Sequence, residues 1–417
     1  MQDEGEITGT GERGNGGTRK DGVRAVTRSR EVPPMKIERF EMERYQSTWE
    51  TTVEFNLADS GVHPITLAAL VDHSWIREVL AREQLGYGHT NGSEELRTLI
   101  AGLYHAAGPE HVLVTTGAAE ANFLITWALL DRSDEAVVML PNYMQIPSLA
   151  RAWGAETVSW WLRPVPGLMG PGTGLREPAQ WGPDLEELER LVSPKTKAIF
   201  VCNPNNPTGA VLSVEAMNAV CAAAARVNAW VVADEVYRGA ELDGHLTGSF
   251  WGRYSKVIVA GGLSKAYGLP GLRIGWIVAP HEVIQVLWGH HDYTTIAPSV
   301  LSDHLARVAL GPRVFQRLAT RTRLILNENL EAVARWVEGM GGLVDWIAPK
   351  AGAIAFLRYR PAVNSTELAT QLRKAHDVLV VPGDHFQLDR HVRIGYGGEK
   401  RLLEEGLRRT GEFLRTL

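Results

Sequence analysis

Strand and helix patterns alternate through the middle of this sequence, and that alternation restricts the fold more than any other feature. Short apolar runs typical of buried strands lie at residues 111–116, 135–140, 156–161, 197–202, 229–233, 256–261 and 273–279. Stretches of helical periodicity separate most of them, and apolar spacing also predicts one helix before them, from residue 65 to residue 83. The alternation predicts an α/β fold with a mostly parallel, seven-stranded sheet and helices on both faces.

The segments on either side of this alternation predict how the rest of the chain is organised. Residues 1–34 are rich in Gly, Arg, Glu and Thr and lack periodicity, which predicts a disordered N-terminal extension. Met35 follows two prolines and opens the first patterned segment, so it is a candidate start of the chain. We expect residues 35–66 to form an N-terminal arm that belongs partly to a small domain, and residues 67–300 to form a large domain. Residues 301–417 are expected to complete the small α+β domain.

Composition and charge exclude several classes of protein. The formal net charge is −5, which gives no sign of a protein that binds nucleic acid. No apolar run reaches the length that a membrane-spanning helix needs. The two cysteines, Cys202 and Cys221, have no metal-type spacing and no secretory signal precedes them, which favours a reducing, cytoplasmic setting without a metal site.

One lysine lies on a tight loop between two of the expected strands. Lys265 follows Ser264 in the segment GLSKAYGLPGLRIGW, which runs from Gly262 to Trp276. The same segment contains Arg273, eight residues after the lysine. Its small residues leave space around the amine. A lysine that bonds covalently to a flat cofactor needs such space, and it needs partial desolvation to become nucleophilic.

Two further motifs also follow expected strands, at whose carboxyl ends open α/β sheets bind ligands. Gly117, Ala118 and Ala119 stand between a strand and a helix, where backbone N–H groups and the helix dipole favour an anion. Asn206 lies in the segment NPNNPTG at 203–209, whose two prolines impose extended backbone. Each motif alone is also compatible with an ordinary turn or a rigid loop.

An acidic residue ends the strand expected at 229–233. Asp234 follows its apolar residues, and Tyr237 comes three residues later, where it can point into the same cleft. Alone, Asp234 is better explained as a helix cap, because a buried carboxylate is costly unless it is paired. With Lys265 and Arg273, however, the set supplies what pyridoxal phosphate needs. It offers an amine for a Schiff base, a carboxylate for the ring nitrogen, donors for the phenolate oxygen and a site for the phosphate.

These motifs, in this order, resemble those of fold-type-I pyridoxal-phosphate enzymes of the class I/II aminotransferase family. The resemblance covers residues from about 36 to 417, and it includes YGHTNG at 87–92, VPG at 381–383 and VRI at 392–394. It implies pyridoxal 5′-phosphate as cofactor and an α-amino acid as substrate, with a 2-oxo acid as second substrate in transamination. It also implies a homodimer with shared active sites.

The resemblance further implies a role for each residue at a matching position. Lys265 would form the Schiff base and move the proton, Asp234 would pair with the pyridine nitrogen, and Arg393 would bind the substrate α-carboxylate. Tyr237 and Asn206 would contact the phenolate oxygen, and Tyr143 would lie on the ring. The phosphate would be bound by Gly117, Ala118, Ala119, Ser264, Arg273 and the neighbouring subunit's Tyr87. Asn206 and Gly61 would assist at the substrate carboxylate. Gly262, Ala118 and Ala119 stand where many members have hydroxyl residues, so the phosphate would depend more on backbone N–H groups.

A narrower resemblance leaves the reaction open. SGVH at 60–63 with Thr66, the lysine segment and LVVPG at 379–383 are similar to the capreomycidine-synthase branch, whose members cyclise hydroxylated arginines. The alternatives are thus amino-group transfer and elimination, replacement or cyclisation on a guanidino amino acid. No second arginine is evident for a side-chain carboxylate, so an acidic substrate is not expected. A regulator that senses pyridoxal phosphate would need a DNA-binding domain, for which residues 1–34 are too short and irregular.

Overall fold

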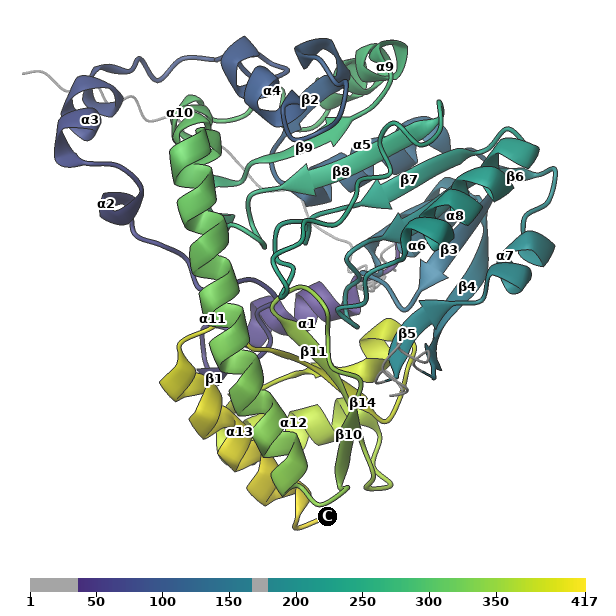
Figure 1. Ribbon diagram of the computed structural model, residues 1–417, viewed down its shortest axis with the longest axis vertical. Helices are drawn as coiled ribbons and strands as arrows, with labels where there is room; N and C mark the ends of the chain where they lie inside the picture. The colour runs from purple at the N-terminus through teal and green to yellow at the C-terminus, as the bar shows by residue number, and fades with distance from the viewer. Residues whose placement is uncertain (1–36, 167–178) are drawn as a thin grey trace, which may run out of the picture. The chain divides into compact units, whose positions relative to one another are not determined.

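The computed structural model describes residues 37–166 and 179–417 (Figure 1). The extension predicted at 1–34 and the candidate start at Met35 lie outside the described residues. All the helices and strands with assigned bounds belong to one unit of the chain, Ile37–Leu417. In the described ranges, no helix is long and apolar enough to cross a membrane.

An eight-stranded sheet forms the centre of this unit. In spatial order its strands are β2 (Val112–Thr115), β9 (Gly275–Val278), β8 (Val257–Gly262), β7 (Trp230–Asp234), β6 (Thr196–Cys202), β3 (Glu135–Leu140), β4 (Glu156–Val165) and β5 (Gln180–Pro183). The five strands from β8 to β4 pair in parallel, whereas β9 pairs antiparallel with β8 and β2, and β5 with β4. The predicted α/β fold with a mostly parallel sheet is confirmed.

The structure differs from the sequence prediction at two places. The sheet has eight strands instead of seven, because β5 pairs with the far end of β4 although its four residues include Gly182 and Pro183 and lack an apolar run. The single helix predicted over 65–83 is wrong. Side chains of Thr66 and Asp72 each cap a separate short helix, so the helical stretch is interrupted between them. The segments formed are α2 (Leu67–Leu70), α3 (His73–Glu78) and the 3₁₀ turn η1 (Leu80–Arg82).

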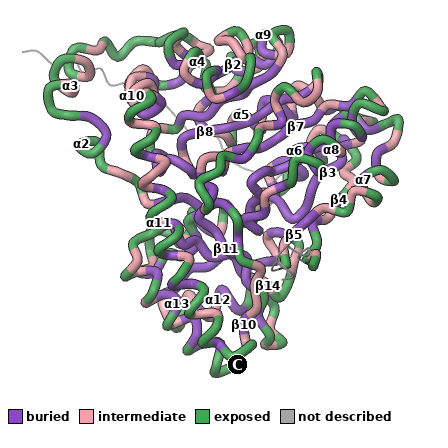
Figure 2. Tube along the Cα trace, viewed as in Figure 1, coloured by how far each residue is buried: buried purple, intermediate pink, exposed green. Residues whose placement is uncertain are grey.

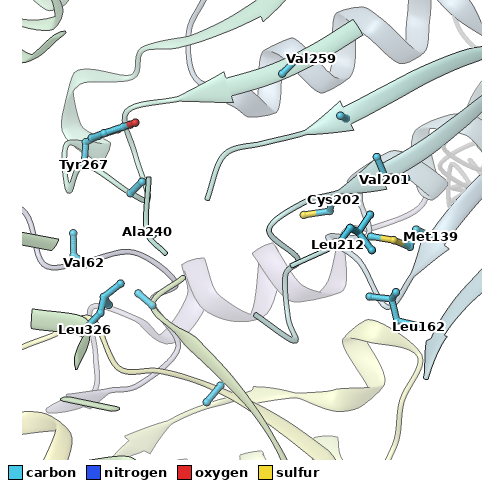
Figure 3. Close-up of a cluster of buried hydrophobic side chains, with 14 of the residues drawn as sticks. Val62, Met139, Leu162, Val201, Cys202, Leu212, Ala240, Val259, Tyr267 and Leu326 are labelled. Atoms are coloured by element: carbon cyan, nitrogen blue, oxygen red, sulfur yellow. The ribbon is translucent and has the colours of Figure 1, made fainter. Parts of the chain in front are cut away.

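Helices cover both faces of the large sheet because side chains alternate between its faces along each strand. On β3, Ala136 and Val138 pack on one face, and Val137 and Met139 on the other. Helices α5 (Ala118–Leu129), α6 (Gln145–Trp153) and α9 (His281–His291) cover the first face, and α4 (Glu94–Ala101), α7 (Leu185–Leu191), α8 (Val214–Arg226) and α10 (Val300–Leu310) belong to the core on the second. Strands β2, β9, β8, β7, β6 and β3 are largely buried, whereas most residues of β4 and β5 are not (Figure 2), and Figure 3 shows part of the second core.

A smaller antiparallel sheet follows the long helix α11 (Pro312–Gly339). Its strands, in order, are β10 (Val344–Trp346), β11 (Ile354–Tyr359), β14 (His391–Gly395) and β13 (Val381–Pro382), with α12 (Ser365–His376) and α13 (Lys400–Leu414) beside them. Besides η1, the described residues form the 3₁₀ turns η2 (Pro109–His111), η3 (Pro270–Leu272) and η4 (Gly383–Phe386). The first helix, α1 (Glu41–Trp49), lies between the two sheets (Figure 1). Strand β1 (Phe55–Asn56) then pairs in parallel with β12 (Val378–Leu379), so the segment after α1 is joined to the segment after α12.

Candidate active site

A cavity of about 300 Å³ lies at the carboxyl ends of β6, β7 and β8, opposite helix α1 and the loop after β1. It brings together nine residues that the sequence predicts for the site, Ala118, Ala119, Tyr143, Asn206, Asp234, Tyr237, Ser264, Lys265 and Arg273. A larger cavity of about 640 Å³, bordered by β4, β5 and the small sheet, holds none of the predicted residues. The candidate catalytic groups therefore gather in the smaller cavity.

Lys265 stands three residues beyond the end of β8, on the floor of this cavity. Burial lowers the pKa of its amine from the ordinary lysine value, and the carboxylate of Asp59 acts in the opposite direction. A side chain at Gly61 would come within 3.3 Å of the Ser264 carbonyl oxygen and 3.6 Å of the Lys265 Cδ atom, so only glycine lets this loop approach so closely without adjustment. The amine is thus confined and partly desolvated, which favours its nucleophilic form.

Asp234 is the last residue of β7 and is 4% exposed. Its Oδ2 accepts a hydrogen bond from Asn122 Nδ2 at 3.1 Å, and its Oδ1 accepts one from the Val236 N–H at 3.1 Å. The bond to Val236 is the cap-like contact that a structural role alone would give. Burial raises the pKa of this carboxyl group, and the two hydrogen bonds oppose that rise. A cationic ring nitrogen in the cavity would stabilise its ionised form.

Tyr237 and Asn206 line the same end of the cavity. The Tyr237 side chain is 2% exposed, and its hydroxyl group is buried without a hydrogen-bond partner among the described residues. Burial raises the pKa of this hydroxyl, so it stays protonated and can donate. The Asn206 Oδ1 accepts from Arg393 Nη1 at 3.1 Å, which leaves its Nδ2 for other contacts. A buried donor without a partner is costly, which indicates that a ligand oxygen completes this place.

The turn before helix α5 lies against Arg273. Gly117 has a φ of +85°, and a side chain there would overlap the Arg273 guanidinium group. Gly275 leaves equally little space, because a Cβ atom on it would lie 2.5 Å from the Ala118 backbone nitrogen. Arg273 itself is exposed, and Ser264 is half-buried beside it. A helix N-terminus and a guanidinium group that meet at one wall of a cavity form a site for an anion.

Arg393 lies in the middle of β14 and is 1% exposed. Its Nη1 donates to Asn206 Oδ1, and its Nη2 donates to the Ala58 carbonyl oxygen at 2.7 Å and to Gln46 Oε1 at 3.1 Å. Its Nε has no partner among the described residues. Gln46 of helix α1 was not predicted from the sequence. Apolar spacing indicates a helix there, but it does not reveal which polar residue of that helix meets β14.

Two predicted tyrosines lie at different distances from this centre. Tyr143 follows β3, lines the cavity, and its hydroxyl group donates to Glu43 Oε1 at 2.8 Å. Its ring also packs edge-on against Phe40, with 4.9 Å between the ring centroids. Tyr87, by contrast, is 85% exposed and does not line the cavity of its own chain.

Comparison with known proteins identifies the family. Residues 66–409 match the family model for aminotransferases of class I and II. This chain belongs to the class I and II aminotransferase family. It is 31% identical to capreomycidine synthase of Streptomyces vinaceus, over 92% of this chain and 95% of that protein. It is 28% identical to the aspartate/prephenate aminotransferase of Thermus thermophilus, over 81% and 86%.

Solved structures agree with this membership of the aminotransferase family. A PLP-dependent aminotransferase from Streptococcus suis matches with a TM-score of 0.83 and 33% identity, over 92% of this chain and 99% of that one. The PLP-dependent cyclase OrfR matches with a TM-score of 0.81 and 28% identity, over 93% and 99%. The chain is therefore a pyridoxal-phosphate-dependent enzyme with a fold-type-I structure.

The residues of the cavity fit this cofactor. The unpartnered hydroxyl of Tyr237 matches the phenolate oxygen, the buried Asp234 matches the ring nitrogen, and the exposed Arg273 beside the start of α5 matches the phosphate. These matches rest on the chemistry of each donor and acceptor.

Proposed function

We propose that this enzyme acts on an α-amino acid, with Lys265 as the Schiff-base lysine and Arg393 as the group that binds the α-carboxylate. The observation that carries the proposal is the arrangement around one cavity. Lys265 and Asp234 line it, and Arg393 is hydrogen-bonded to two of its lining residues, Asn206 and Gln46. An amino-acid substrate needs a lysine that exchanges its Schiff base with the substrate amine, and a group at the same cavity that binds the substrate carboxylate. The planar fork of arginine suits a carboxylate.

The other residues of the site have complementary roles in the proposal. When bound, pyridoxal phosphate supplies the electron sink that makes a proton on the substrate Cα removable. Lys265 would take and return that proton, because it is the one lysine among the described residues that line the cavity. Asp234 keeps the ring nitrogen protonated, which preserves the electron sink.

The remaining contacts hold the cofactor in a fixed orientation. Tyr237 and Asn206 donate to the phenolate oxygen, and Tyr143 packs on the ring. The phosphate is bound by Gly117, Ala118, Ala119, Ser264 and Arg273.

A second candidate function has specific support. Capreomycidine synthase and the cyclase OrfR both match over more than nine-tenths of this chain. These relatives support elimination, replacement or cyclisation on a hydroxylated guanidino amino acid instead of amino-group transfer. In both functions Lys265 removes the same Cα proton. The two functions differ in what the substrate then becomes, because amino transfer releases its carbon skeleton as a 2-oxo acid, whereas elimination removes a leaving group from its side chain.

One experiment separates the two functions. The purified holoenzyme is incubated with a panel of amino acids that includes arginine and hydroxyarginines, with and without a 2-oxo acid. Amino transfer would form pyridoxamine phosphate and a new 2-oxo acid. Elimination or cyclisation would leave pyridoxal phosphate unchanged and give a product lighter than a hydroxyarginine by one water. Absence of both from every amino acid would refute the proposed function.

We also propose that the enzyme is a homodimer with shared active sites. Tyr87 and Leu85 are 85% and 82% exposed on one loop, which is unusual for large apolar side chains and favours a covering subunit. In this proposal Tyr87 donates to the phosphate held by the other subunit. Tyr87→Phe protein would be mixed with Lys265→Ala protein at low pyridoxal phosphate. Each mixed dimer would then hold one intact site, and activity should reappear. A fully active monomer would overturn the proposal.

We propose a cytoplasmic location for this enzyme. Cys202 and Cys221 are both free and buried, which suits a reducing compartment. Fractionation of source cells with an antibody against the chain would test it, and recovery from an oxidising compartment would refute it.

A further inference from the structure

The outer wall of the active-site cavity carries three carboxylates. Glu43 lies on helix α1, Glu50 directly follows that helix, and Asp59 lies on the loop after β1. All three are exposed and line the same cavity as Lys265. Glu43 accepts a hydrogen bond from the Tyr143 hydroxyl group, and Asp59 accepts one from the Gly61 N–H at 3.0 Å. Both contacts fix a carboxylate in place without neutralising it.

The balance of charges in the cavity leaves these carboxylates without a cationic partner. In the proposed function, Arg273 meets the phosphate, Arg393 meets the α-carboxylate, Asp234 meets the ring nitrogen and Lys265 bonds to the cofactor. Among the described residues that line the cavity, no other lysine or arginine is present, and no histidine. Each carboxylate would therefore face the substrate with its charge uncompensated.

A separate observation indicates that the cavity these carboxylates line takes a ligand. The Tyr237 hydroxyl group and the Asn122 Oδ1 both belong to residues that line the cavity, both side chains are 2% exposed, and neither polar atom has a partner among the described residues. Glu43 and Asp59 act on both ends of the site. Burial lowers the pKa of Lys265 and of Arg393, and both carboxylates oppose that change in each case. Glu43 and Asp59 consequently lie close enough to interact electrostatically with the Lys265 amine and the Arg393 guanidinium group.

We propose that Glu43 and Asp59 determine substrate specificity by binding a positive charge at the end of the substrate side chain. The inference rests on the proposed function and holds for either of its two reactions. An α-amino acid spans the cavity with its carboxylate at Arg393 and its amine at Lys265, so its side chain extends toward the open wall. A guanidinium or an ammonium group there would meet Glu43 and Asp59. A side-chain carboxylate would be repelled by both.

The test compares amino acids of nearly equal shape and different charge. Arginine and citrulline differ in charge but have similar length, and lysine and norleucine form a second pair with an ammonium group in place of the guanidinium group. Half-saturation is measured from the change in the visible spectrum of the holoenzyme as each amino acid is added. We expect arginine, lysine or both to bind at least about tenfold more tightly than the neutral partner. The better pair identifies the cation.

Substitutions assign that preference to residues. Glu43→Gln and Asp59→Asn should each reduce the charged-to-neutral ratio by about fivefold, the factor that corresponds to about 1 kcal/mol for an ion pair open to solvent. Glu41→Gln is the matched control, because Glu41 lies on the same helix but does not line the cavity. It should leave the ratio unchanged.

The outcomes distinguish this inference from the proposed function. If neutral amino acids change the spectrum as readily as charged ones, the specificity inference fails and the proposed function stands. A normal ratio in both Glu43→Gln and Asp59→Asn would overturn the assignment to these residues. A spectrum that no amino acid changes would overturn the proposed function and the inference with it.

Discussion

Gly275→Ala should weaken cofactor binding far more than a methyl group on a loop normally would. The added Cβ atom would lie 2.5 Å from the Ala118 nitrogen and 2.8 Å from the Gly117 carbonyl oxygen. An ordinary contact begins at 3.4 Å, so the turn before α5 has to move by about 1 Å. This turn carries the N–H groups that face the phosphate in the proposed site, so the strain falls on the anion site.

The size of the effect follows from the cost of overpacking. Forcing an extra methyl group into a closed space costs about 1–3 kcal/mol. If the cofactor-bound turn cannot relax, that cost appears as a loss of pyridoxal-phosphate affinity of about 5- to 150-fold. The apoenzyme would be titrated with pyridoxal phosphate and followed by its visible absorbance, and the melting temperature of the apoenzyme would be measured in parallel.

Gly271→Ala is the matched control for this prediction. It adds the same methyl group two residues before Arg273, but no heavy atom lies within 4 Å of the new Cβ atom. Its cofactor affinity and melting temperature should equal those of the wild-type protein. If Gly275→Ala binds pyridoxal phosphate as tightly as Gly271→Ala does, the close approach of β9 to the turn before α5 does not contribute to cofactor binding.

Four further predictions concern single side chains. Lys265→Ala should abolish turnover of every amino acid, as assayed by product mass, and normal turnover would show that another group does its work. Asp234→Asn should fold normally but lose several powers of ten in kcat, since a neutral amide does not hold a ring nitrogen protonated; an unchanged kcat would reduce Asp234 to a cap. Arg393→Lys should raise KM for all amino acids and leave the cofactor spectrum nearly intact, because lysine cannot reproduce the fork that contacts Asn206, Ala58 and Gln46; an unchanged KM would place the carboxylate elsewhere. Burial raises the pKa of Glu235 from 4.5 to about 7, so its contribution is full below pH 4.5 and is lost as the pH rises through 7. Glu235→Gln should therefore show a smaller fall in melting temperature between pH 5 and 7 than the wild-type protein, and parallel curves would contradict the cause given for that shift.

The large sheet was predictable because strands buried on both faces of a parallel sheet consist of consecutive apolar residues, which are visible in the sequence. Six of the seven predicted strands lie in the interior of the final sheet, where they pair on both sides, and all of these except β4 contain such a run. Strand β5 could not be found in this way, since its pairing with β4 depends on where that long strand ends and not on its own composition. The division of residues 65–83 depended on two caps, Thr66 and Asp72, that apolar spacing alone does not take into account.

The inner part of the site was predictable for a topological reason. Parallel strands end at the same edge, so residues that follow β6, β7 and β8 must meet, and Asn206, Asp234 and Lys265 do. The outer part was not, because Gln46 and Glu43 reach the cavity through the packing of α1 between two sheets. The roles of the site residues and the domain boundaries at 35–66, 67–300 and 301–417 stay predictions.

The pairing of β1 with β12 sets the order in which the enzyme can be completed during synthesis. Phe55 and Val378 are partners in that short ladder, and Arg393 contacts Gln46 across almost the whole chain. Helix α1, which lines the candidate site, is therefore synthesised long before Arg393, the residue proposed to bind the α-carboxylate. Contacts between such distant segments are slow to form, because a long loop must close first. Substrate recognition should accordingly arise only after Arg393 has been synthesised, whereas the phosphate turn and Lys265 are synthesised well before it.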